Sequence, residues 1–212
     1  MGLFDLFGKK SAPEKRPVSA VPTRIEKIIQ NSDKAIADMQ NADAAFEKDG
    51  DLEKRIAVYE KYLLSKPEWN SFNFSISLAK MYVKAGRNND AWSYLNQMYM
   101  WSIDPSAVGG DASKVRFEQF KILKTEKKLE DAMVMLVSSY VLNAYSVQNM
   151  YFNKEKFIKD AKTTFKSLGF SDLDLQIFSD SLEKDIKAKR IKEDTTKDFC
   201  TEFYKKHGSG KG

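Results

Sequence analysis

Apolar residues recur at steps of three, four and seven positions along most of the chain beyond residue 22, with polar residues between them. This is the period of a helix that buries one face. No segment shows a sustained alternation of apolar and polar residues between turn dipeptides, so strands are not expected. The pattern predicts an all-α protein. The expected helices lie near residues 23–48, 52–65, 71–85, 89–103, 113–126, 129–150, 154–168, 171–186 and 196–206.

The segment from Leu78 to Leu95 has the spacing of two short antiparallel helices that pack face to face. Leu78 and Tyr82 lie on one stripe of the first helix. Gly86 can adopt the left-handed conformation that ends this helix, and Ala91 begins the facing stripe of the second. The segment therefore predicts a helical hairpin.

Methyl-sized side chains at Ala79 and Ala91 would let the two backbones of this hairpin approach closely. With them, the order of residues resembles a tetratricopeptide repeat, a helix-turn-helix unit with a period of about 34 residues. The resemblance covers roughly residues 36 to 140 and is best from Leu78 to Leu95. It implies a short, tetratricopeptide-like α-solenoid of antiparallel helix pairs, in a family whose known members bind other proteins. An ordinary helical bundle is the alternative.

The two flanking copies depart from the repeat at their small and turn positions. Upstream, Asp43 and Arg55 occupy the two small sites, so this pair is expected to splay or to form an end unit. Downstream, Phe120 takes a small site and Lys127 replaces the turn glycine. The part beyond Tyr151 lacks the repeat signature, and its helices are expected to cap the stack.

These patterns divide the chain into four parts. We expect a flexible N-terminal segment with an apolar tip at 1–22, repeats at 23–150, C-terminal helices that pack on the repeats at 151–206, and a disordered tail at 207–212.

Composition indicates a protein that folds without disulfides. Hydrophobic residues make up 42% of the chain, and the single Cys200 cannot form an intrachain disulfide. The sequence has no signal peptide pattern, so a cytoplasmic location is expected. The net charge of +5 comes from 35 basic and 30 acidic residues that mostly alternate, which does not favour nucleic acid as a partner.

The N-terminal tip combines apolar residues at helical spacing with lysines. The tip residues are Leu3, Phe4, Leu6, Phe7, Lys9 and Lys10. Apolar insertion into a lipid interface, with about 1 kcal/mol from each basic residue, would give weak peripheral contact with a membrane. A disordered tail, and docking on the chain's own domain or on a partner, remain alternatives.

Residues that carry chemistry are scarce. The one histidine, His207, lies near the C-terminus, and its separation from Cys200 does not match a common zinc ligand pair. Paired carboxylates fall at helix starts, where they stabilise the positive end of the helix dipole. We therefore expect no enzyme activity, no catalytic residues, no metal and no cofactor.

The resemblance implies that the first helices of the pairs line a concave groove that is basic and partly apolar. Its expected residues are Asn73, Ile76, Lys80, Val83, Lys114, Phe117, Lys121 and Lys124. Lysines beside apolar residues suit an extended or helical segment of acidic character. Lysines that merely keep the helices soluble are the alternative. The family's carboxylate clamp pairs Lys with Asn, but Ile76 and Lys80 occupy those places, which puts that activity in doubt.

The functional hypothesis is a non-enzymatic adaptor or scaffold that binds a peptide or protein segment in this groove, with the N-terminal tip supplying localisation. The alternative is a dedicated chaperone or immunity-type protein for one secreted or toxic partner.

Overall fold

The computed structural model describes residues 24–64, 71–104, 111–146 and 152–208, and this part of the chain is helical without strands. The N-terminal tip and most of the tail from residue 207 lie outside it. The α-helices are α1 (Arg24–Asp49), α2 (Leu52–Leu63), α3 (Phe72–Lys84), α4 (Asn88–Ser102), α5 (Ala112–Thr125), α6 (Leu129–Tyr145), α7 (Lys154–Ser167), α8 (Asp172–Lys187) and α9 (Thr196–Gly208), with a 3-10 turn at Glu193–Thr195 before the last. Most bounds agree with the sequence prediction within two residues.

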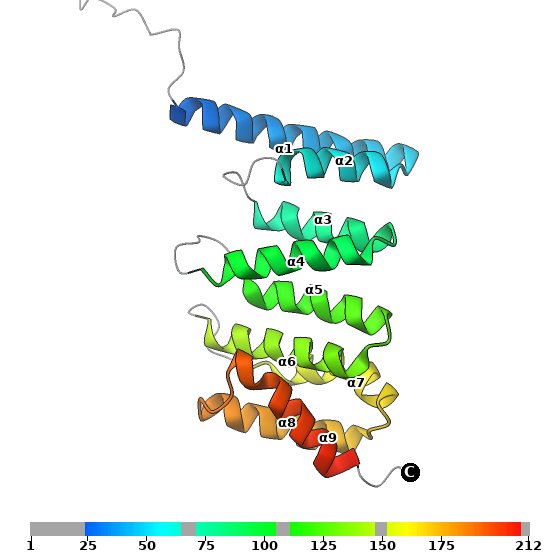
Figure 1. Ribbon diagram of the computed structural model, residues 1–212, viewed down its shortest axis with the longest axis vertical. Coiled ribbons are helices and arrows are strands. Elements are labelled where there is room, and N and C mark those ends of the chain that lie inside the picture. The colour runs from blue at the N-terminus through cyan, green and yellow to red at the C-terminus, as the bar shows by residue number, and fades with distance from the viewer. Residues whose placement is uncertain (1–23, 65–70, 105–110, 147–151, 209–212) are drawn as a thin grey trace, which may run out of the picture.

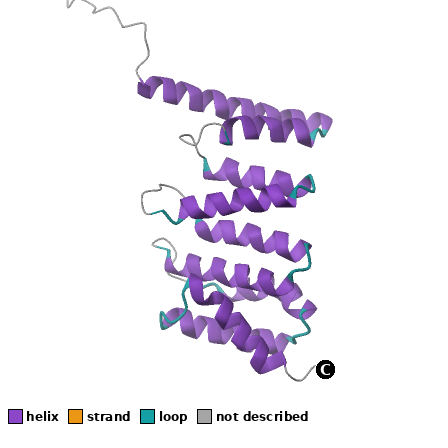
Figure 2. Cartoon of the chain, in the orientation of Figure 1, coloured by secondary structure: helices purple, strands orange, loops and turns teal. Residues whose placement is uncertain are grey.

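The helices follow one another along the longest axis of the molecule, from α1 at one end to α7, α8 and α9 at the other (Figure 1). Each helix from α1 to α7 packs against the next one in sequence, and α3 also contacts α5. The last helix, α9, instead packs on α6. Where the joining loops are described they are short (Figure 2), so consecutive helices run antiparallel as hairpins.

One turn geometry ends four of these helices. The residues after α3, α5, α7 and α8 have left-handed backbones at Gly86, Lys127, Gly169 and Lys189, with φ between 53° and 86°. In each turn the following N–H bonds to a carbonyl five residues back, as in Arg87 N to Tyr82 O at 2.8 Å. This pattern satisfies carbonyls that the helix end leaves open.

The shared turn extends to the C-terminal helices. The sequence predicts no repeat beyond Tyr151, yet α7 and α8 form a hairpin whose Gly169 has φ 86° and the same hydrogen bonds. Ser171 and Asp174 then form a capping box that begins α8. The chain therefore continues the hairpin plan of its middle into its last third.

The N-terminal pair replaces small residues with charge. Between α1 and α2, Arg55 Nε donates to Asp43 Oδ1 at 2.7 Å, and the Tyr59 hydroxyl donates to the same carboxylate at 3.0 Å. The equivalent sites between α3 and α4 are Ala79 and Ala91, both buried. The two residues that break the repeat pattern thus bond to each other across the hairpin.

The buried side chains form two clusters, one in each half of the stack. Leu78, Ala91 and Leu95 belong to the N-terminal cluster. Several aromatic rings pack together in the C-terminal cluster, where the fully buried Phe178 lies 5.2 Å from Phe165 and 4.9 Å from Phe203 of α9 between ring centroids. Helix α9 therefore supplies part of the core that it covers.

One detail of the sequence prediction needs correction. Helix α9 continues through His207 and Gly208, where His207 stacks on Phe203 with ring centroids 4.2 Å apart, so these two residues are not a disordered tail. The described helices include none with the length and apolar character needed to cross a membrane.

Candidate functional site

The residues expected to line a groove come from α3 and α5, which contact each other as first helices of consecutive hairpins. Four of them are exposed: Asn73, Lys80, Lys114 and Lys121. Three are half-buried: Val83, Phe117 and Lys124. Ile76 is the exception, because only 7% of it is exposed and it packs in the N-terminal cluster. Ile76 therefore belongs to the core, and the prediction that it lines an open surface is wrong.

A hollow of about 210 Å³ lies between α3 and α5. Val83 and Ile122 are among its apolar lining residues. At its rim Glu118 Oε1 lies between two ammonium groups, 3.4 Å from Lys80 Nζ and 2.9 Å from Lys121 Nζ. Two cations share one carboxylate, so the rim keeps a net positive charge.

A second hollow, of about 510 Å³, lies where α5 faces α6 and α7. Its lining residues are Asp111, Ser113, Lys114, Phe117, Ser139, Tyr140, Asn143, Asn153 and Lys156. Within the described ranges neither Lys114 nor Lys156 forms an ion pair. Two uncompensated ammonium groups at one concave surface attract carboxylates or other anions.

Phe117 is the aromatic residue that joins the lysines of this surface. Its half-buried ring lies 4.8 Å from Lys121 Nζ and 5.6 Å from Lys156 Nζ, measured to the ring centroid. Phe120, which is buried, packs beneath it with ring centroids 5.8 Å apart. An ammonium over an aromatic face is held by cation–π attraction. The arrangement presents an apolar surface with positive charge from α5 and from α7 close to it.

Hydrogen bonds hold the helices around the second hollow in place. Ser139 Oγ donates to the carbonyl of Ser113 at 2.8 Å, which joins α6 to α5. The Tyr140 hydroxyl donates to Asp160 Oδ2 at 2.8 Å, which joins α6 to α7. Burial raises the pKa of Tyr140, and the hydrogen bond to Asp160 raises it further, so the phenol stays neutral at physiological pH.

A further bond joins the two outer helices of this surface. Lys124 Nζ donates to Thr163 Oγ1 at 2.7 Å, from α5 to α7. Lys124, expected as a contact for a partner, is therefore already engaged within the chain. Together with Tyr140 and Ser139, this bond fixes the spacing of the helices before any ligand arrives.

Sequence reasoning missed residues that come from α7, and it missed the carboxylate at the rim of the first hollow. Lys156 and Asn153 line the second hollow, and Glu118 lines the first. The signal for α7 was present, since Asn153 caps the helix and Gly169 ends it in the same way as Gly86 ends α3. If α7 is taken as the first helix of another hairpin, its Lys156 is expected on the same surface as Phe117, where the structure has it.

The described residues show no arrangement suited to metal binding: none of their His, Cys, Asp and Glu side chains form a group of three or more that could hold an ion. Burial raises the pKa of the Cys200 thiol to about 12, so the thiol is protonated at neutral pH. No protein-family model matches the sequence, and no curated protein or solved structure matches it.

Proposed function

We propose that the protein is a non-enzymatic adaptor or scaffold that binds a segment of another protein across α3, α5 and α7. The observation that carries this proposal is the half-buried Phe117, which has ammonium groups from α5 and α7 at 4.8 Å and 5.6 Å from its ring centroid and lines a hollow. The hairpins with a common left-handed turn support the resemblance to tetratricopeptide repeats, which forms part of the proposal.

The chemistry of this surface defines the segment that would bind. Lys114 and Lys156 form no ion pair with a described acidic side chain and outnumber Asp111 in the lining of the second hollow, so carboxylates on the partner gain from proximity to them. The exposed part of Phe117 and the apolar lining beside Val83 contribute favourably when apolar side chains cover them. The expected ligand is an extended or helical segment that alternates acidic and apolar residues.

Charge reversal at the second hollow tests this proposal. In a Lys114→Glu/Lys156→Glu variant the attraction becomes repulsion. Proteins that the intact chain captures from lysate at low ionic strength should therefore not be captured by this variant. The captured proteins are identified by mass spectrometry, and their affinity for each variant is then measured with purified partner. A Phe117→Ser variant should weaken the same partners by about tenfold or more, as for removal of an aromatic contact residue.

A matched control changes the same charge elsewhere. Lys166 and Lys184 are exposed on α7 and α8 and do not line either hollow. Lys166→Glu/Lys184→Glu should therefore retain the partners. Equal loss in both double variants would mean that net charge, and not this surface, governs binding, and an unchanged partner set in the first would refute the assignment.

A further inference from the structure

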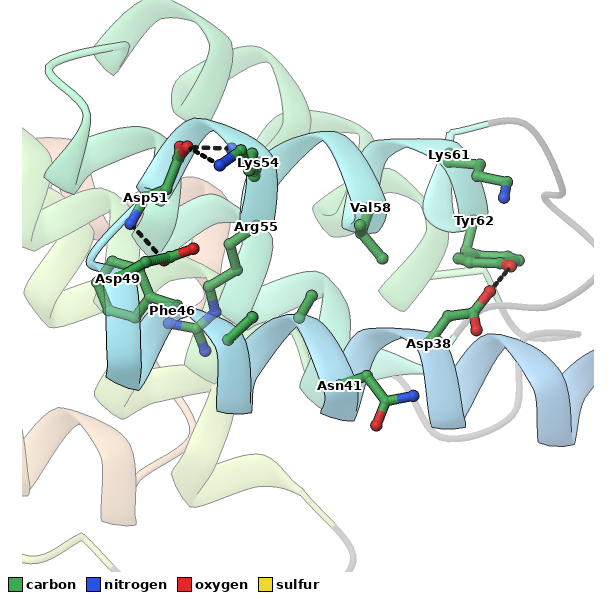
Figure 3. A pocket seen from close by; sticks show the side chains of 12 residues that line it. Asp38, Asn41, Phe46, Asp49, Asp51, Lys54, Arg55, Val58, Lys61 and Tyr62 are labelled. Carbon is green, nitrogen blue, oxygen red and sulfur yellow. Dashed lines mark hydrogen bonds and ion pairs between the residues drawn. The ribbon is translucent and has the colours of Figure 1, made fainter.

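A separate groove lies between α1 and α2, at the N-terminal end of the stack (Figures 1 and 3), which we name the end groove. Its volume is about 400 Å³, within the range of sites that hold a small ligand or a few side chains. It is lined by Asp38, Asn41, Ala42, Ala45, Phe46, Asp49, Asp51, Lys54, Arg55, Val58, Lys61 and Tyr62. The end groove is distinct from the surface formed by α3, α5 and α7.

Several polar groups that border the end groove have partners inside the chain. At one end the Tyr62 hydroxyl donates to Asp38 (Figure 3), and between the helices Arg55 is paired with Asp43. The Arg55 guanidinium also lies 5.1 Å from the centroid of the Phe46 ring. An apolar ligand can enter without disrupting these bonds.

The floor of the end groove is apolar and partly open. Phe46 and Val58 are half-buried, and Ala42 between the helices is half-buried as well, while Ala45 is exposed. A stack of helical hairpins needs a polar outer face at its ends, because an apolar end face remains in contact with water. None of the residues that the structure describes lies beyond α1 and α2 to cover this floor.

We propose that the end groove binds the apolar tip of this chain's own N-terminal segment, Leu3 to Phe7. Leu3, Phe4, Leu6 and Phe7 are spaced to form one apolar face of a short helix. Such a face is complementary to a narrow apolar groove between two helices. The tip thus takes the place that a polar capping helix has in other stacks.

The length of chain between the tip and α1 permits this contact. Residues 8–23 separate Phe7 from Arg24, and when extended they span about 50 Å. Along α1, the end groove begins about 20 Å from Arg24 and ends about 40 Å from it. The tip therefore reaches every part of the groove from its own attachment point.

The tether also favours the chain's own tip over a second copy. A connection of this length gives an effective concentration on the order of 1 mM, far above a protein concentration in the micromolar range. Docking of the tip within one molecule is therefore more populated than docking of a tip from a second molecule.

Disulfide cross-linking tests the proposal in the full-length chain. A cysteine at Gly8, beside the intact tip, is paired with a cysteine at the exposed groove position Ala45. The buried Cys200 does not compete, because burial keeps its thiol protonated and out of contact with solvent. On mild oxidation at micromolar protein, we expect an intrachain disulfide to form at least about tenfold faster than in Gly8→Cys/Ala44→Cys.

Ala44 is a matched control because it is exposed on the same helix, one residue away, and does not line the end groove. Serine at all four apolar tip positions, in the Gly8→Cys/Ala45→Cys background, should lower the rate to that of the control. The proposal would be overturned if the disulfide formed at equal rates with cysteine at position 44 and at position 45. It would also be overturned if the serine substitutions left the rate unchanged, or if disulfide-linked dimers were the main product. None of these outcomes bears on the α3, α5 and α7 surface.

Discussion

The two ends of the helical stack are built from similar hairpins but are stabilised in different ways. At the C-terminal end α9 packs on α6, and its Phe203 packs against the fully buried Phe178 and Phe165 in an aromatic cluster. At the N-terminal end an ion pair between Asp43 and Arg55 joins α1 to α2 beside an open apolar groove. A hairpin can thus be held by packing when another helix covers it, and by polar bonds when one side is open.

The difference matters because the two kinds of interaction contribute unequally. Burying an aromatic side chain contributes several kcal/mol, whereas an ion pair near the surface contributes about 0–1 kcal/mol. The Arg55 and Asp43 side chains retain 23% and 35% exposure, so solvent screens their attraction. We therefore expect the N-terminal hairpin to open more readily than the C-terminal helices.

The largest predicted effect is loss of the aromatic cluster. Phe178→Ala removes a fully buried ring that contacts Phe165, Phe199 and Phe203, and should lower the free energy of unfolding by about 3–5 kcal/mol. Urea denaturation measures this change. Leu173→Ala on the same helix is the control: Leu173 is 68% exposed, so its effect should stay within about 0.5 kcal/mol. Similar losses in both variants would contradict a closed C-terminal core.

The N-terminal ion pair should show a smaller effect and strong coupling. Asp43→Ala leaves Arg55 and the Tyr59 hydroxyl without their carboxylate and should cost about 1–3 kcal/mol of unfolding free energy. The double variant Asp43→Ala/Arg55→Ala restores the two small residues found in the middle hairpin, and should cost less than the sum of the single changes. A double-mutant cycle by urea denaturation measures the coupling. Strict additivity would show that the pair contributes no specific interaction.

Substitutions in the backbone turns at the two ends should change the stability of the protein in opposite directions. Gly50 ends α1 with φ 69°, and nothing lies within 4 Å of an added Cβ, so Gly50→Ala should cost about 1 kcal/mol through backbone strain alone. Lys189, after α8, has φ 53°, and Lys189→Gly should stabilise the protein by up to about 1 kcal/mol. Thermal denaturation of both variants checks the signs. A destabilising Lys189→Gly would mean that the lysine side chain outweighs the strain.

A loss of stability in alkali is expected at the C-terminal end. Burial raises the pKa of Cys200 from 9.0 to about 12, so the folded state keeps a proton that the unfolded state loses above about pH 9. The contribution of the Cys200 thiol to the free energy of unfolding is fully present below pH 9 and falls as the pH rises toward 12. Unfolding free energies at pH 7.5 and 10.5, under reducing conditions, should fall more for the unmodified chain than for Cys200→Ala. Equal declines would show that the thiol titrates normally.

The helix map could be predicted from sequence because it depends on local signals. Periodic apolar residues, the Ser171 cap and the turn glycines all act within a few positions, and Lys127 adopts the left-handed turn conformation at the place where it aligns with Gly50 and Gly86. The surface was predicted less completely. Which face of α3 is covered depends on its neighbours in space, so the burial of Ile76 did not follow from its spacing.

Longer-range pairing was also beyond the sequence pattern. Asp43 and Arg55 were recognised as departures from the repeat, but their bond requires knowledge of how α1 crosses α2. Lys156 joins the candidate surface only because α7 packs on α6 and brings it within 5.6 Å of the Phe117 ring. These contacts join residues far apart in the chain, and periodicity carries no information about them.

Native-state hydrogen exchange tests the difference between the two ends most directly. The amides of Tyr59 in α2 and Phe178 in α8 both belong to fully buried residues inside helices, so their exchange reports the opening of each end. The open N-terminal hairpin predicts a lower opening free energy at Tyr59 than at Phe178, and the Phe178 amide should exchange only through global unfolding. Equal opening free energies, or a lower value at Phe178, would contradict the account.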